Sequence, residues 1–331
     1  MPVVDAHTHF IPLEFVELLR AGGGPPGLEV LDRKGRDPLV RHPNGLAYPV
    51  LPAFSDLSEK LAQMDRDGID VSLCSISPSL LLYDADPEQT LLAHRAINDA
   101  GAALARRAGG RVRVLATVPL NAPQAAADEL RRACGELGLV GVEIGPGAGG
   151  RQLDDPAYEP FFAVAEELGT TVMVHPYRNM IEPPGPDLAG FHLANVLGNP
   201  FETTVAAFRL IVGGVLDRHP GLTFQLSHAG GAVPFQLGRL AHAYRVRQET
   251  RKHAHRDPIG YLDRFLFDSV IFNAVALRFL IERVGAHRVV FGTDLPFDMG
   301  DDEGLATLRD VAGEQFELIA GGNALRAYGI A

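Results

Sequence analysis

The sequence predicts an α/β fold in which one domain of 331 residues forms a (β/α)8 TIM barrel with a long Gly/Pro-rich insertion after the first strand. Eight short apolar segments recur along the chain, and each precedes a helical pattern or a long excursion. Regular alternation of strands and helices favours a parallel sheet, and eight repeats favour a closed barrel. An open doubly wound sheet is the alternative, but no G-x-G-x-x-G motif follows an early strand to support it.

The expected strands are short segments rich in valine, isoleucine, leucine and phenylalanine. The first, Val3-Val4, leads directly into Asp5-Ala6-His7-Thr8-His9. The others span residues 69–76, 111–118, 140–144, 170–175, 222–228, 265–268 and 288–292.

The expected helices lie between these strands. Ser55 or Ser58 can cap the first of them, and Gly68 stops it after Asp67. The next is a long segment rich in Ala, Leu, Glu and Arg, which are strong helix formers. Beyond the first, the expected helices span residues 87–108, 123–137, 156–168, 200–218, 234–251 and 274–284, with further helices at the C-terminus.

Residues 21–52 interrupt the alternation. They contain Gly22-Gly23-Gly24-Pro25-Pro26 and His42-Pro43-Asn44-Gly45, which disfavour regular helices and strands over much of the stretch. The segment is too long for a simple connector, so we expect a functional excursion over one face of the fold.

Composition limits the partners of the protein. Hydrophobic residues make up 46% of the chain, which is ample for a large core, and the net charge of −11 argues against nucleic acid or an anionic membrane surface. Cys74 and Cys134 are too few for a disulfide framework, so we expect reduced, structural cysteines in a cytoplasmic protein. We see no signal peptide and no apolar run of about 18 residues.

Polar side chains follow four of the predicted strands. His7 and His9 lie at the end of the first strand, and His175, His228 and Asp294 end the fifth, sixth and eighth. The carboxyl ends of barrel strands meet at one mouth, and residues i and i+2 of a strand face the same side, so these groups can share one cation. Each alone is equally compatible with a structural role, but together they favour a site for Zn²⁺ or another divalent ion.

The order of these residues resembles the amidohydrolase superfamily. The motifs around them are similar to those of its decarboxylase branch, which includes aminocarboxymuconate semialdehyde decarboxylase, and the similarity runs from residue 4 to Gly322-Asn323-Ala324. The motifs are Asp5-Ala6-His7-Thr8-His9-Phe10, His175-Pro176, Ser227-His228-Ala229-Gly230-Gly231, Leu237-Gly238-Arg239 and Gly292-Thr293-Asp294-Leu295-Pro296-Phe297.

The resemblance implies that His7, His9, His175 and Asp294 ligate one zinc ion, with Mn²⁺ as an alternative, and that His228 is an acid/base beside it. It implies non-oxidative decarboxylation of a small aromatic or unsaturated carboxylic acid, for which the metal centre and Asp294 are essential. A hydrolase or hydratase acting on a lactone, amide or double bond is the second hypothesis. A non-catalytic barrel that binds a small anion is the third.

A single metal ion is favoured over two. Binuclear members of the superfamily commonly bridge two metals with a modified lysine, but Lys34, Lys60 and Lys252 all lie away from the predicted strand ends. Glu143 in the fourth strand is a possible bridging ligand; its alternative is a buried charge paired elsewhere.

The residues predicted to contact the substrate match the family pattern less closely than the predicted metal ligands do. Tyr48 stands where the family decarboxylase has an arginine that holds a carboxylate, and Arg178 is a candidate for supplying that charge. Arg239 matches a family arginine that reaches a neighbouring active site, which implies a homodimer. Phe297 and Phe191 match aromatic wall residues, although both are also compatible with core packing.

Overall fold

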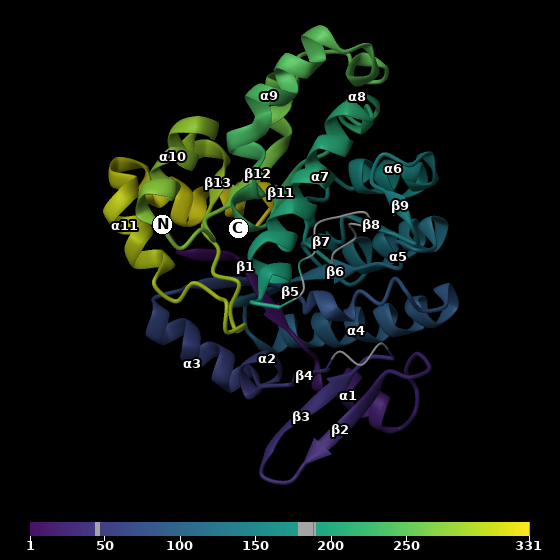
Figure 1. The fold of residues 1–331 in the computed structure, drawn as a ribbon. Helices are drawn as coiled ribbons and strands as arrows, with labels where there is room; N and C mark the ends of the chain where they lie inside the picture. Colours follow the sequence, from purple (N-terminus) through teal and green to yellow (C-terminus); the bar gives the residue numbers. More distant parts are fainter. Residues whose placement is uncertain (44–46, 178–187, 189, 331) are drawn as a thin grey trace.

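The computed structural model describes residues 1–43, 47–177, 188 and 190–330. Eight parallel strands form one sheet in the order β1-β5-β6-β7-β10-β11-β12-β13. The backbone N–H of Ala6 in β1 donates to Phe291 O (2.8 Å) beyond β13, and His9 N–H donates to Leu295 O (2.9 Å), so the sheet closes on itself. Helices surround these strands (Figure 1), which confirms the predicted barrel.

The barrel strands agree with the sequence prediction in order and place, with shorter bounds at most positions. They are β1 (Val4–Phe10), β5 (Val71–Ile76), β6 (Val112–Thr117), β7 (Gly141–Ile144), β10 (Val172–Val174), β11 (Phe224–Leu226), β12 (Phe265–Asp268) and β13 (Val289–Val290). β1 contains both His7 and His9 near its carboxyl end, as expected from the sequence.

Two helix predictions need correction. Asp56, rather than Ser55 or Ser58, caps α3 (Leu57–Asp67) by accepting from the N–H groups of Ser58 and Glu59. The helix expected over residues 200–218 divides at Gly213-Gly214, because Gly214 adopts φ +73°. The remaining long helices are α1 (Leu13–Arg20), α4 (Pro87–Arg107), α5 (Pro123–Gly135), α6 (Glu159–Glu167), α7 (Asn199–Val212), α9 (Val233–Val246), α10 (Ala274–Val284) and α11 (Gly304–Ala312); α2 (Pro52–Ser55), α8 (Val215–Arg218) and α12 (Asn323–Ala327) are short.

The insertion is more regular than its composition predicts. It contains an antiparallel sheet of β2 (Glu29–Arg33), β3 (Arg36–Arg41) and β4 (Ala47–Pro49). Gly35, with φ +68°, joins β2 to β3, whereas Pro38 lies within β3. The sheet projects beside the barrel (Figure 1) and carries Tyr48 on β4.

The amino end of the barrel is plugged by the C-terminal segment. Tyr328 and Ile330 pack against Val4, Leu115 and other buried barrel side chains. The Tyr328 hydroxyl donates to Gln225 Oε1 (2.8 Å), and Gln225 Nε2 donates to Ala6 O (2.8 Å). In the described part of the chain, the C-terminal segment therefore fills the amino end of the barrel. Both cysteines are free, and no helix of the described residues is long and apolar enough to cross a membrane.

Candidate active site

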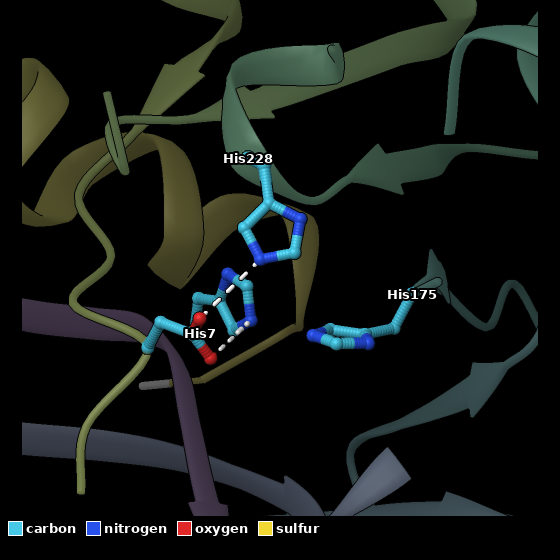
Figure 2. A group of neighbouring side chains, drawn as sticks. His7, His175 and His228 are labelled. Atoms are coloured by element: carbon cyan, nitrogen blue, oxygen red, sulfur yellow. Dashed lines mark hydrogen bonds and ion pairs between the residues drawn. The ribbon is translucent and has the colours of Figure 1, made fainter. Parts of the chain in front are cut away.

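All five expected strand-end residues meet at the carboxyl end of the barrel. One ligand atom from each of His7, His175, His228 and Asp294 lies within 4.8 Å of the others. Figure 2 shows the rings of His7, His175 and His228 turned toward one shared space. His9 adjoins this group, because its Nε2 lies 2.9 Å from Asp294 Oδ1.

The two oxygens of Asp294 face different neighbours. Oδ1 lies 2.9 Å from His9 Nε2 and 3.4 Å from His7 Nε2, whereas Oδ2 lies 3.3 Å from His228 Nε2. The carboxylate thus has one oxygen toward His7 and His9 and the other toward His228.

Hydrogen bonds at Nδ1 orient three of the rings. His7 Nδ1 donates to Asp268 Oδ2 (2.6 Å), His9 Nδ1 to Ile76 O (3.1 Å) and His175 Nδ1 to Pro176 O (3.0 Å). A proton at Nδ1 leaves the Nε2 lone pair facing the site. Nε2 of His7 and Nε2 of His175 are buried and have no hydrogen-bond partner among the described residues, so the donor set fits a cation bound between them.

The charges of the site also favour a cation. Burial would raise the pKa of Asp294, but the adjacent His7, His228 and His9 hold it well below its usual range. Burial would lower the pKa of His7, but Asp294 and Asp268 raise it to about 9. His175 differs, because burial and the neighbouring histidines lower its pKa well below the usual value. The carboxylates therefore hold a proton on His7, and a divalent cation at this centre can replace that proton.

Asp268 is a site residue that the sequence analysis missed. Its carboxylate accepts from His7 Nδ1 and from the backbone N–H groups of His228 (2.9 Å) and Ala229 (2.7 Å). His228 and Ala229 have φ of +54° and +55°, a conformation that these contacts help to hold. Asp268 ends an apolar strand as Asp294 does, so the strand-end pattern could have identified it.

Glu143 lies on β7 at the edge of the site. Both of its carboxylate oxygens are buried without a hydrogen-bond partner in the described part of the chain, and Oε1 is 4.0 Å from His175 Nδ1. Burial raises the pKa of Glu143 to about 8. The bridging role of Glu143 stays a prediction; the one metal-type cluster found among the described residues does not include it.

The predicted substrate contacts fall in different places. Tyr48 and Phe297 line a cavity of about 400 Å³ together with His175, His228 and Asp294, and the Phe297 ring centroid is 4.9 Å from that of His9. The remaining three are placed elsewhere or not described: Phe191 is 95% exposed and does not line this cavity, Arg239 is exposed on α9, and Arg178 lies outside the described residues.

Comparisons with known proteins agree with this fold and site. The amidohydrolase family model matches residues 4–330. The 2-amino-3-carboxymuconate-6-semialdehyde decarboxylase of Dictyostelium discoideum is 30% identical over 99% of this chain and 91% of its own length. The gamma-resorcylate decarboxylase of Rhodococcus jostii is 31% identical over 72% of this chain and 77% of its own. The crystal structure of 5-carboxyvanillate decarboxylase LigW from Sphingomonas paucimobilis matches with a TM-score of 0.83 at 25% identity, covering 100% of this chain and 99% of that one.

The chain therefore belongs to the amidohydrolase family. Within that family it lies in the branch of the decarboxylases that it resembles along most of its length. The resemblance inferred from the strand-end motifs is confirmed.

Proposed function

We propose that this protein is a metal-dependent, non-oxidative decarboxylase of a small aromatic or unsaturated carboxylic acid. The observation that carries the proposal is the convergence of four imidazoles and the Asp294 carboxylate at the open end of the barrel. The relatives named above, all decarboxylases, support the choice of reaction.

In this proposal His7, His9, His175 and Asp294 would together hold one zinc ion. Three imidazoles and a carboxylate are a common zinc donor set, and manganese is the alternative ion. When bound, the metal would stabilise the negative charge that develops on the substrate as CO₂ departs. The tautomers fixed at Nδ1 support this assignment.

His228 is the proposed acid/base. Its side chain is 13% exposed, so it reaches the cavity, and its Nε2 contacts Asp294 Oδ2 at 3.3 Å. An imidazole holds and releases protons near neutral pH. His228 can therefore hold a proton at Nε2 and deliver it to the substrate carbon that loses its carboxyl group.

The cavity supports a planar acid as the substrate. Phe297 contributes an aromatic wall beside His9, and Tyr48, on β4 of the insertion, also lines the cavity. Arg178 and Phe191 remain proposed contacts to the substrate.

A homodimer is part of the proposal. Phe235 and Phe279 are 76% and 42% exposed, with ring centroids 6.3 Å apart, and Val275 beside them on α10 is 72% exposed. Arg239 lies one helical turn beyond Phe235 on α9. An exposed apolar face next to Arg239 supports an interface through which this arginine reaches the site of the second copy.

The activity is tested with zinc-loaded protein and a panel of hydroxybenzoic and unsaturated dicarboxylic acids. We expect release of CO₂ with the rest of the skeleton unchanged. Products that contain oxygen from ¹⁸O-labelled water, without CO₂ release, would instead establish the hydrolase or hydratase hypothesis and refute this one.

A further inference from the structure

The cavity at the carboxyl end of the barrel has two chambers that meet at His228 and Asp294. The main chamber, of about 400 Å³, contains Tyr48 and Phe297, and the side chamber has a volume of about 270 Å³. Both chambers share the lining residues Asn195, Asn199, His228, Asp294 and Met299.

The two chambers differ in chemistry. The residues that line only the main chamber include the hydroxyl groups of Tyr48, Ser77, Ser79 and Tyr177. No residue that lines only the side chamber, among those described, has a polar side chain. These residues are Val196, Pro200, Ala229, Gly231, Val270, Ile271 and Phe272.

Three of these residues are consecutive in the loop from β12 to α10. Val270, Ile271 and Phe272 follow Asp268 and Ser269 at the carboxyl end of a barrel strand, where loops commonly carry functional groups. Phe272 is 55% exposed and has φ +55°, a backbone conformation that L-residues with large side chains rarely adopt. The loop thus presents apolar side chains to the side chamber, and Ile271 also packs against the hydrophobic core.

We infer that the side chamber is a subsite for an apolar, uncharged substituent of the substrate, such as an alkyl or methoxy group on its ring. This inference rests on the proposed function, because it places the reacting carboxyl group at the boundary formed by His228 and Asp294. From that boundary, a ring in the main chamber can direct one substituent past Asp294 into the side chamber.

The physical basis is the difference between burying apolar and charged groups. Val196 and Phe272 are 50% and 55% exposed without a ligand, so an alkyl group that covers them removes apolar surface from water. Each buried methylene contributes about a fourfold gain in affinity. A charged substituent would lose its hydration, and beyond the shared boundary the seven residues that line only the side chamber have no polar side chain to form a compensating hydrogen bond.

Ile271 provides the test, because it is half-buried and lines only the side chamber. Ile271→Phe narrows the chamber and Ile271→Ala widens it. Leu92→Phe adds the same aromatic group at an exposed position on α4, away from both chambers, and serves as the control. The probes are 2-hydroxybenzoate and its monomethyl, monoethyl and monopropyl derivatives at each ring position.

Binding of each acid to the zinc-loaded proteins is measured by calorimetry, and CO₂ release is measured separately. For at least one ring position, we expect affinity for the wild type to rise about fourfold per added carbon. Ile271→Phe should reduce the affinity for the propyl acid about tenfold or more and change the affinity for 2-hydroxybenzoate less than threefold. Leu92→Phe should change neither affinity.

The two proposals fail in different ways. The expected binding pattern without CO₂ release from any acid would refute the decarboxylase and leave the subsite standing. CO₂ release with equal responses of substituted and unsubstituted acids to both Ile271 variants would overturn the subsite. Absence of binding by every acid would also overturn it.

Discussion

Asp268 Oδ2 lies 2.6 Å from His7 Nδ1, and the same carboxylate accepts the backbone N–H groups of His228 and Ala229. One side chain at the end of β12 therefore positions a proposed metal ligand and the proposed acid/base. His7 Nδ1 and the His228 N–H both donate to Oδ2, and the Ala229 N–H donates to Oδ1, so both oxygens act as acceptors.

Asp268→Asn should weaken zinc binding about 10- to 100-fold, because one acceptor oxygen becomes an N–H donor and the contacts to His7 and to the His228 turn cannot all be retained. The dissociation constant is measured by competition with a chelator. Asp263→Asn, at an exposed ion pair with Arg256, is the control for loss of an aspartate charge. Unchanged zinc affinity in Asp268→Asn would remove Asp268 from its positioning role.

His228→Ala should retain most of the zinc and lose about 100- to 10,000-fold in turnover, because proton delivery is lost while the three proposed imidazole ligands remain. Metal content and the rate of CO₂ release are measured on the same sample. His255→Ala, at an exposed histidine, is the control. A variant that loses its zinc and recovers full rate when metal is added would identify His228 as a ligand instead.

Glu143 should make the metal-free protein less stable as pH rises. Its pKa is raised from 4.5 to about 8 by burial, so the folded chain keeps a proton that the unfolded chain releases. The stabilisation is full below pH 4.5 and falls as the pH rises toward 8. When the pH rises from 6 to 8, the unfolding free energy of the wild type should fall by about 2 to 3 kcal/mol more than that of Glu143→Gln.

Urea unfolding at the two pH values measures this difference. Glu136→Gln, on the surface, controls for the loss of one negative charge. If the wild type and Glu143→Gln differ by the same free energy at both pH values, Glu143 does not carry the proton.

Mixing two inactive variants tests the role of Arg239 across the dimer. A subunit with Arg239→Ala keeps its own His228, and a partner with His228→Ala can still donate Arg239. If half of the dimers are mixed after subunit exchange, one of their two sites is intact, so about a quarter of the wild-type activity should return. Activity that stays at the level of the separate variants would place Arg239 outside the neighbouring site.

Much of the fold follows from patterns that are local in the sequence. The strand β12 and the helix α10 have the bounds expected from their composition, and the strand-end residues His175, His228 and Asp294 meet as the closed barrel requires. These features were predictable because apolar runs and the polar residues that end them are determined by burial.

Other features depend on contacts between distant segments. The β2–β3–β4 sheet forms by pairing between strands, and Gly35 makes the turn from β2 to β3. The Gly/Pro-rich composition of the segment did not predict that pairing. The role of Asp268 depends on acceptor geometry toward β1 and the His228 turn. The side chamber depends on how the loop after β12 packs beside α7, which no single segment encodes.

Titration of the metal-free protein with zinc tests the central claim most directly. We predict one ion per chain, binding with release of about one proton at pH 7 because His7 has a pKa of about 9 in the metal-free state. Its affinity should fall sharply in His7→Ala and in Asp294→Ala, and Asp294→Ala should also lose activity. Wild-type zinc affinity and kinetics in Asp294→Ala, or no stoichiometric binding of zinc or manganese to the wild type, would contradict the account.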